Sequence, residues 1–168
     1  MPPPNSAAVV ADTSPLISLD ACNKLDLLRK LYSRVVVPRA VEMELSVGGT
    51  TGLPKGLTLA HRKWIGVRTL RTPPPPALLA ALHIGEAEVI ALALEISSPL
   101  VLLDETAARK LARDRGLQVA GAIGILLRAK NKGLLPAVKP SIDLMLSKGV
   151  QLSSGLIDSV LRGTGEIP

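Results

Sequence analysis

The run Val9-Val10-Ala11-Asp12-Thr13-Ser14-Pro15-Leu16-Ile17 passes from a short apolar segment through an aspartate into a second apolar segment. Ala7–Ala11 is typical of a buried strand of a parallel sheet, because such strands are apolar on both faces. Leu16–Leu19 indicates the helix that follows. A buried strand that runs through a polar residue into a helix is the repeating unit of α/β folds.

The same unit recurs along the chain. Arg34–Val37 is β-branched and predicts a second strand, with Pro38 in the first turn of the next helix. The other expected strands are Trp64–Leu70, Leu100–Leu103 and Leu117–Ala120. The other expected helices are Asn23–Tyr32, Ala77–Leu82, Glu86–Ile96, Thr106–Arg115, Ile123–Lys132, Ser141–Leu146 and Ser154–Leu161. The alternation predicts a three-layer α/β/α fold around a mostly parallel sheet.

The domain organisation follows from length and from the positions of Gly and Pro. A chain of 168 residues suits one domain, which we expect to span residues 1–168, with a core at about 8–132 and a helical extension at about 136–163. Gly48–Leu59 is rich in Gly, Thr and Pro, which marks a loop. Pro73–Pro76 predicts a stiff, extended linker.

Composition limits the class of protein. Hydrophobic residues make up 47% of the chain, yet there is no Phe, one Trp and one Tyr, so the core must be aliphatic. Cys22 is the only cysteine, which excludes a disulfide scaffold. The mean hydropathy is +0.34, but the longest apolar runs fall far short of the ~18 residues of a membrane span. The N-terminus has no cationic region typical of a signal peptide, so we expect a cytoplasmic protein.

The charge balance admits an anionic partner. Lys and Arg number 20 against 14 Asp and Glu, so 20 − 14 gives a net charge of +6. Nucleic acid is one such partner, although the near absence of aromatic residues argues against binding by base stacking.

Acidic residues gather where a parallel sheet places its active site. Asp12 ends the first strand and Asp104 ends a later one, and ligands of α/β sheets bind at the carboxyl ends of strands. Glu44 comes from the helix after the second strand, and Glu86 and Glu88 from a nearly apolar helix. Clustered carboxylates raise one another's pKa unless a cation neutralises them, and oxygen ligands favour Mg²⁺ or Mn²⁺. Such ions support phosphodiester hydrolysis.

Each acid also has a structural interpretation. Asp12 and Asp104 can each cap the helix that follows, Glu44 can be a solvated helix residue, and Glu86 can favour the helix dipole in the first turn. Glu88 is harder to explain in this way, because its neighbours are apolar. The joint arrangement at strand ends favours a functional site.

The basic residues do not form one block. Arg109 and Lys110 lie on the helix that begins beside Asp104, and either could hold an RNA phosphate there. The remaining basic groups are typical of solvated helix faces. His61, His83 and Cys22 have no spacing that indicates a metal or catalytic site, so we interpret them as structural.

Four segments, in order, resemble the motifs of the PIN-domain family. The run Val9–Ile17 resembles its opening strand, and Val37-Pro38-x-x-Val41-x-x-Glu44-Leu45 resembles its second acidic motif. Gly85-Glu86-Ala87-Glu88 with the following Val89–Ala93 resembles the third, and Val101-Leu102-Leu103-Asp104-Glu105 the fourth. The segment Gly121-x-x-Gly124-x-Leu126-Leu127-x-Ala129-Lys130 and the helical tail resemble a subgroup of uncharacterised nucleic-acid-binding PIN proteins. The similarity spans Ala8 to about Gly163.

The resemblance implies a Mg²⁺- or Mn²⁺-dependent ribonuclease. It implies Asp12, Glu44, Asp104 and either Glu86 or Glu88 as metal ligands or ligand-positioning groups, and it places Ser14 where a polar residue hydrogen-bonds the first aspartate. It also implies RNA as substrate, a homodimer, and an antitoxin partner if the chain is the toxin of a toxin–antitoxin pair. Two positions depart from the family: two glutamates stand where many members have one aspartate, and Asp104-Glu105 replaces the Thr-x-Asp or Thr-x-Asn of toxins.

Two alternatives remain open at this stage. The first is a PIN-like module that binds nucleic acid or protein without catalysis. The second rests on Gly49-Thr50-Thr51-Gly52-Leu53-Pro54-Lys55-Gly56, which resembles the phosphate-binding loop of adenylate-forming enzymes and could bind a nucleotide. That family has much longer chains, and Lys55 lacks the following Ser or Thr of a Walker A loop.

Overall fold

A computed structural model describes residues 8–47 and 57–168, and within them five strands form one parallel sheet. The strand order is β3-β2-β1-β4-β5. The strands are β1 (Val9–Ala11), β2 (Val35–Pro38), β3 (Ile65–Arg68), β4 (Val101–Leu102) and β5 (Val119–Ala120). The expected parallel sheet is confirmed.

The first strand occupies the centre of the sheet. Val10 pairs with Val36 of β2 on one side and with Val101 of β4 on the other. Every residue of β1, β2 and β4 is buried, which is why these segments are runs of Val, Leu and Ala without polar alternation. The residue that follows β1 therefore emerges at the middle of the sheet's carboxyl edge.

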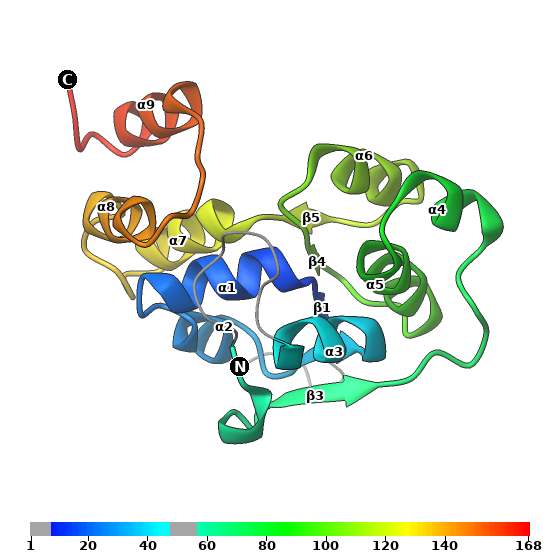
Figure 1. Ribbon diagram of the computed structural model, residues 1–168. Helices are drawn as coiled ribbons and strands as arrows, with labels where there is room; N and C mark the ends of the chain where they lie inside the picture. The colour runs from blue at the N-terminus through cyan, green and yellow to red at the C-terminus, as the bar shows by residue number, and fades with distance from the viewer. Residues whose placement is uncertain (1–7, 48–56) are drawn as a thin grey trace.

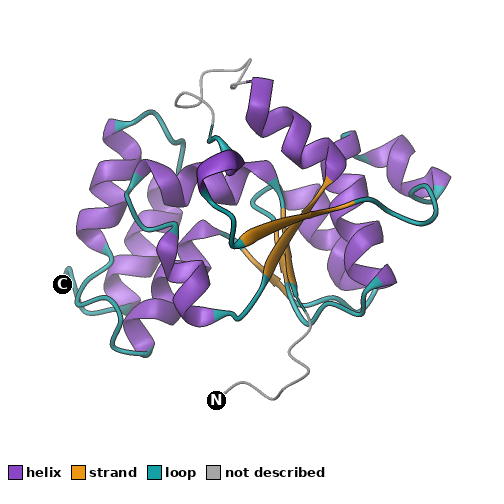
Figure 2. Ribbon diagram, turned by 90° about the horizontal axis from the view of Figure 1, so that it is seen from below, coloured by secondary structure: helices purple, strands orange, loops and turns teal. Residues whose placement is uncertain are grey.

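Helices cover both faces of the sheet, as Figures 1 and 2 show, and this confirms the three-layer α/β/α architecture. One layer contains α3, α4, α5 and α6, with α5 packed against β1 and β2. These four helices span, in that order, Arg39–Val47, Pro76–Ala81, Ile84–Glu95 and Thr106–Asp114. The other layer contains α1, α2, α7 and α8, in which α1 contacts both α7 and α8. These four helices span, in that order, Thr13–Ala21, Asp26–Leu31, Ala122–Asn131 and Lys139–Ser147.

The C-terminal helix α9 (Ser154–Gly163) lies beyond α7 and α8, at the end of the molecule away from α4 (Figure 1). Glu166 ties the tail that follows it to the rest of the chain. Its carboxylate accepts hydrogen bonds from Lys130 Nζ at 2.7 Å, Val138 N at 2.9 Å and Lys139 N at 2.7 Å. The last two are donors at the start of α8, so the tail caps that helix.

Several element boundaries differ from the sequence prediction by one to a few residues, and two of these differences involve proline. Pro38 is the last residue of β2, a position where the missing N–H of proline is tolerated. Helix α3 begins at the next residue, Arg39. The first helix begins at Thr13 rather than Leu16, because Pro15 fits the first turn of a helix. Gly116 ends α6 as expected, with the positive φ of +80° that glycine adopts freely. Most of the expected loop Gly48–Leu59 lies outside the described residues, and Leu59–His61 forms a short 3₁₀ helix.

The core is aliphatic, as the composition requires. Its largest fully buried side chains are Leu and Ile residues, including Leu16, Leu28, Ile90, Leu102 and Leu126. Among the described residues, no helix is both long enough and apolar enough to cross a membrane.

Candidate functional site

Asp12 stands at the centre of the sheet's carboxyl edge. Its backbone N–H continues the β1–β4 ladder by donating to Leu102 O at 3.0 Å. The residue as a whole is buried, with 6% of its surface exposed. Asp12 occupies the N-cap position of α1, yet its side chain makes no capping hydrogen bond there. Helix capping therefore does not account for this buried aspartate.

The Asp12 carboxyl is unfavourable in its charged form. Its pKa is raised from 3.8 to about 7, first by burial and then by the negative charges of Glu86, Glu44 and Asp104, against a backbone hydrogen bond from Thr13 that lowers it. Burial penalises an ionised carboxylate, and nearby like charges add to the penalty. These three acids are among those that the sequence placed together with Asp12.

Glu44 reaches the site from α3. Its Oε2 accepts a hydrogen bond from Thr13 Oγ1 at 2.5 Å, which joins α3 to the first residue of α1. On its other side lies Gly85 of α5, where a Cβ atom would stand only 2.8 Å from Glu44 Oε1. Gly85 thus leaves the space that the Glu44 carboxylate fills. Thr13 and Gly85 position this acid, and sequence reasoning assigned neither of them that role.

The structure separates the two glutamates of α5. Glu86 is buried, and burial together with Glu105 and Glu44 raises its pKa against a hydrogen bond from the His83 backbone. Glu88 lies two residues further, roughly 200° around the helix axis. Its Oε2 accepts the N–H of Ala40 at the start of α3, at 3.0 Å. Glu86 therefore faces the Asp12 cluster, whereas Glu88 connects α5 to α3. The helix-end interpretation also holds for Glu86 in part, because its Oε2 accepts the His83 N–H at 3.2 Å.

Asp104 lies between β4 and α6 and contacts the start of α7. Its Oδ1 accepts the N–H of Ala122 at the start of α7 at 3.0 Å, while the adjacent Glu105 caps α6 by accepting the Ala108 N–H at 2.8 Å. Burial raises the pKa of Asp104, opposed by the Ala122 hydrogen bond and by the charge of Arg109. A Cβ atom at Gly121 would lie 2.5 Å from Asp104 Oδ1 and 2.9 Å from Arg109 Nη1. Because Gly121 has no side chain, the Asp104 carboxylate and the Arg109 guanidinium can both lie close to its backbone.

The three expected substrate-binding residues are placed differently. Arg109 is half-buried beside Asp104, and its Nη1 donates to Leu103 O at 2.8 Å. Lys110 points to solvent and pairs with Asp114 at 2.8 Å. Ser14 lies in the first turn of α1, and it makes no side-chain hydrogen bond with the residues in ranges 8–47 and 57–168, so the expected bond to Asp12 is not present.

Among the residues interpreted as structural, Cys22 lies in the core and His83 adjoins Glu86 at the start of α5. Cys22 is buried and donates to Leu19 O at 3.4 Å, and burial raises the pKa of its thiol to about 11. His83 is the N-cap residue of α5. The expected nucleotide-binding loop Gly49–Gly56 lies outside the described residues.

The acidic cluster suits a hard divalent cation in donor type and charge. Within the described part of the chain, no three His, Cys, Asp or Glu side chains are grouped closely enough to hold a metal ion as they stand. The donors are nevertheless carboxylate oxygens, and the pKa of Asp12 is raised first by burial and then by the neighbouring acids, a penalty on the charged form that a bound cation offsets. Asp12, Glu44, Glu86 and Asp104 are the residues that would hold it.

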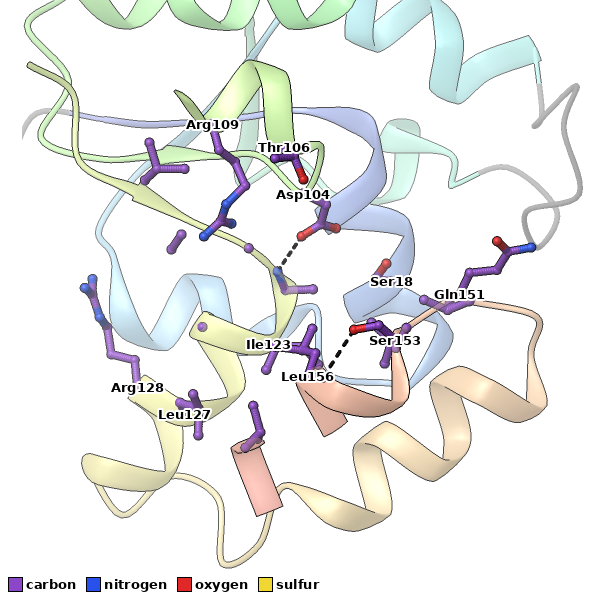
Figure 3. A pocket seen from close by; sticks show the side chains of 18 residues that line it. Ser18, Asp104, Thr106, Arg109, Ile123, Leu127, Arg128, Gln151, Ser153 and Leu156 are labelled. Atoms are coloured by element: carbon purple, nitrogen blue, oxygen red, sulfur yellow. Dashed lines mark hydrogen bonds between the residues drawn. The ribbon is translucent and has the colours of Figure 1, made fainter. Parts of the chain in front are cut away.

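A pocket of about 600 Å³ opens directly beside Asp104 (Figure 3). Residues of α1, α6 and the first turns of α7 line it, together with the C-terminal segment that includes α9. Asp104, Thr106 and Arg109 form one wall and Ile123, Leu127 and Leu156 form the opposite side. The pocket and the acidic cluster therefore share Asp104.

Comparison with known proteins agrees with this geometry. A protein described as a PilT N-terminus domain protein from the hyperthermophilic archaeon Sulfolobus solfataricus shares the fold, with a TM-score of 0.52 and 18% sequence identity over 72% of this chain and 92% of that one. No curated protein matches the chain.

A family model described as a PIN domain matches residues 8–166, which is almost all of the sequence. PIN domains are generally nucleases and typically use divalent metals. This match over almost the whole sequence, in agreement with the three-layer fold, shows that the chain belongs to the PIN-domain family.

Proposed function

We propose that the protein is a Mg²⁺- or Mn²⁺-dependent endoribonuclease whose acidic site consists of Asp12, Glu44, Glu86 and Asp104. The observation that carries the proposal is Asp12, a buried aspartate at the central strand end whose pKa is raised to about 7 by burial and by the other three acids. A buried carboxyl with a strongly raised pKa is costly in its charged form, and such groups cluster at functional sites.

Each acid has a distinct structural support. Asp12 is fixed by the β1–β4 ladder, Glu44 by Thr13 Oγ1, and Asp104 by the Ala122 N–H. Glu86 is held against the start of α5 by the His83 N–H. For Glu44, Glu86 and Asp104 the bond fixes the direction of the side chain and leaves the other carboxylate oxygen to bind a cation, whereas the bond of Asp12 fixes its backbone.

A divalent metal at this cluster would lower the pKa of a water molecule and neutralise charge on a phosphodiester. The protein must first release the Asp12 proton, so metal binding and proton release are coupled. Arg109 stands beside Asp104, where its guanidinium can hold a phosphate of the RNA next to the one that is cleaved. Lys110 is more exposed and can add long-range attraction.

Under the same proposal, a homodimer and a small inhibitory antitoxin are the expected protein partners. Sedimentation of the purified protein tests the first. Co-expression with the protein encoded by a neighbouring reading frame, followed by assay of RNA cleavage, tests the second, because an antitoxin abolishes cleavage.

Cleavage of a labelled RNA with Mg²⁺ or Mn²⁺ tests the nuclease proposal. Asp12→Asn should abolish cleavage, because it removes the charge on which the cluster depends. Glu86→Gln and Glu88→Gln form a matched pair on one helix. We expect Glu86→Gln to reduce cleavage by about 10²-fold or more and Glu88→Gln by much less, since Glu88 is engaged by Ala40.

The variants also distinguish the non-catalytic alternative. A binding module would retain RNA binding in wild type and Asp12→Asn alike and would cleave no RNA with either metal. Equal loss of cleavage in the two glutamine variants would contradict the assignment of Glu86 as the third acid.

A further inference from the structure

The pocket beside Asp104 combines an aliphatic surface with charged and polar groups. Its apolar side is formed by residues of α7 and the C-terminal segment, among them Ile123, Leu127, Leu156 and Val160. Its charged lining residues are Arg109, Arg128 and Asp104, two guanidinium groups and one carboxylate, which gives a net charge of +1. A volume of about 600 Å³ lies within the range of small-molecule sites.

The two arginines are held in place at the pocket. Arg109 Nη1 donates to Leu103 O, and Arg128 Nη1 donates to the hydroxyl of Tyr32 at 2.5 Å while its guanidinium stacks over the Tyr32 ring at 5.9 Å from the centroid. A guanidinium has five N–H donors, so each retains donors for a ligand. Positive groups fixed in this way suit a phosphate.

Ser18 adds a polar group to the lining of the pocket. It lies on α1, is only 5% exposed and lines the pocket, where Figure 3 shows its hydroxyl on the same side as Asp104. Its hydroxyl makes no hydrogen bond with any residue in the described ranges. Among the described residues no buried side-chain oxygen lacks a hydrogen bond, so the Ser18 hydroxyl is accessible from the pocket, where it can bond a polar group of a ligand.

We propose that this pocket is a nucleotide subsite, which binds the nucleotide of the RNA strand next to the phosphate at the acidic cluster. The phosphate faces Arg109 and Arg128, the Ser18 hydroxyl bonds the ribose or the base edge, and the base lies against the aliphatic side formed by Ile123, Leu127 and Leu156. The subsite rests on the proposed ribonuclease function. It also explains how a chain without Phe can hold a base, since van der Waals contact with Leu and Ile side chains needs no aromatic ring.

Ser18→Ala is the most informative variant, because it separates binding from folding. Removal of an unpartnered hydroxyl from a helix should leave the free energy of unfolding unchanged or raise it. Binding of a short single-stranded oligoribonucleotide should weaken about fivefold, as expected for one lost hydrogen bond. Ser141→Ala is the matched control, since Ser141 is also helical and 3% exposed but does not line the pocket.

Two further pairs change the shape and charge of the pocket. Leu156→Glu should weaken binding about tenfold or more, whereas Leu146→Glu should leave it unchanged, because the two leucines are 43% and 41% exposed and only Leu156 lines the pocket. Gly124→Leu fills the pocket from α7, where a Cβ meets only Ala120 at an ordinary 3.5 Å. Gly163→Leu at the end of α9 is its control, with open space around the glycine.

The measurement is fluorescence anisotropy with the labelled oligoribonucleotide, and calorimetry with each of the four ribonucleoside 5′-monophosphates. All variants carry Asp12→Asn, so that no RNA is cleaved. Weaker oligoribonucleotide binding in the pocket variants and unchanged binding in their controls supports the proposal. Equal binding in the variants and controls overturns it, and so does an effect confined to free monophosphates, which assigns the pocket to a free nucleotide. If wild type fails to cleave RNA while the pocket variants still bind it weakly, the ribonuclease proposal fails and the subsite remains.

Discussion

Asp12 is the residue at which the requirements of folding and of the proposed chemistry conflict. Its pKa is about 7 in the folded protein against an ordinary value of 3.8. Between these values the folded state holds a proton that the unfolded state has released. Asp12 therefore contributes stability fully below pH 3.8 and loses that contribution as the pH rises through 7.

The variant Asp12→Asn should make the metal-free protein more stable. Asparagine is neutral at every pH, so it avoids the cost of a buried charge near three other acids. At about pH 8 in a chelator, we expect the free energy of unfolding to rise by a few kcal/mol, and at about pH 4 we expect little difference. Urea unfolding across this pH range is the measurement. The exposed Asp114→Asn is the control, and a wild-type advantage at high pH would contradict the prediction.

Gly85 and Gly121 act through the absence of a side chain. A Cβ at Gly85 would lie 2.8 Å from Glu44 Oε1, so even alanine must displace that carboxylate. The same argument applies to Gly121 beside Asp104 and Arg109. A close approach of this kind links each acid to the start of a helix.

Gly85→Ala should weaken Mn²⁺ binding without loss of stability. Alanine favours a helix over glycine by up to about 1 kcal/mol, which offsets the strain of moving Glu44. Calorimetric titration with Mn²⁺ should show an affinity reduced about tenfold. Gly155→Ala is the matched control, because Gly155 is likewise the second residue of its helix and has open space around it. Equal Mn²⁺ affinity in both variants would contradict the positioning role of Gly85.

At the scale of elements, the strand and helix order could be predicted because each unit has its own hydrophobic pattern and terminator. Val9–Ala11 and Val35–Val37 are continuous apolar runs, and Gly116 stops α6. The choice between Glu86 and Glu88 could not be predicted. The helix that carries them is apolar nearly all round, so its sequence does not show which face meets β1 and β2.

Contacts between distant elements were also beyond prediction. Asp104 bonds Ala122 of α7, and Thr13 bonds Glu44 of α3, across intervals that no local pattern records. The structural interpretation of Asp104 as a helix cap was correct in kind, but the helix is α7 rather than α6, which Glu105 caps.

Glu166 connects the C-terminal tail to α7 and to the start of α8. Burial raises its pKa, but the hydrogen bonds from Lys130, Val138 and Lys139 outweigh this effect and lower the pKa from 4.5 to about 2. The charged form is thus favoured in the folded state. This stabilisation is complete above pH 4.5 and is lost as the pH falls towards 2.

Glu166→Gln should reduce the free energy of unfolding by about 1–3 kcal/mol near neutral pH, because three donors lose a charged acceptor. The difference from wild type should shrink as the pH falls towards 2, because Glu166 then becomes protonated and loses its charge. Thermal unfolding followed by circular dichroism measures it. The control is Asp143→Asn, which breaks an exposed pair with Lys139 and should cost less than about 0.5 kcal/mol. An equal cost for both variants would rule out the role assigned to the tail.

At the scale of the whole molecule, the fold brings four acids from four segments of the chain to one edge of the sheet. Each segment is anchored by the aliphatic core, so the repulsion among the acids is balanced by packing elsewhere. A cation that binds this edge relieves the repulsion and should stabilise the entire fold.

Addition of Mn²⁺ should therefore raise the unfolding temperature of the wild-type protein. At a concentration of about 100 times the Kd, linkage predicts about 2.7 kcal/mol of added stability. Asp12→Asn should show little change, whereas Glu88→Gln should respond as wild type does. Differential scanning calorimetry at about pH 8 measures the shift, since the Asp12 proton then does not compete with the metal. The same shift in Asp12→Asn would contradict the assignment of the site.

The central position of β1 has a consequence for synthesis of the protein. Val10 pairs with Val101, and Asp104, the acid that follows β4, accepts a hydrogen bond from the Ala122 N–H at the start of α7. A growing chain folds from its N-terminus, so this contact cannot form until the start of α7 has left the ribosome. Under the proposed ribonuclease function, an unfinished chain would therefore lack the complete acidic edge and would not cleave the messenger from which it is being translated.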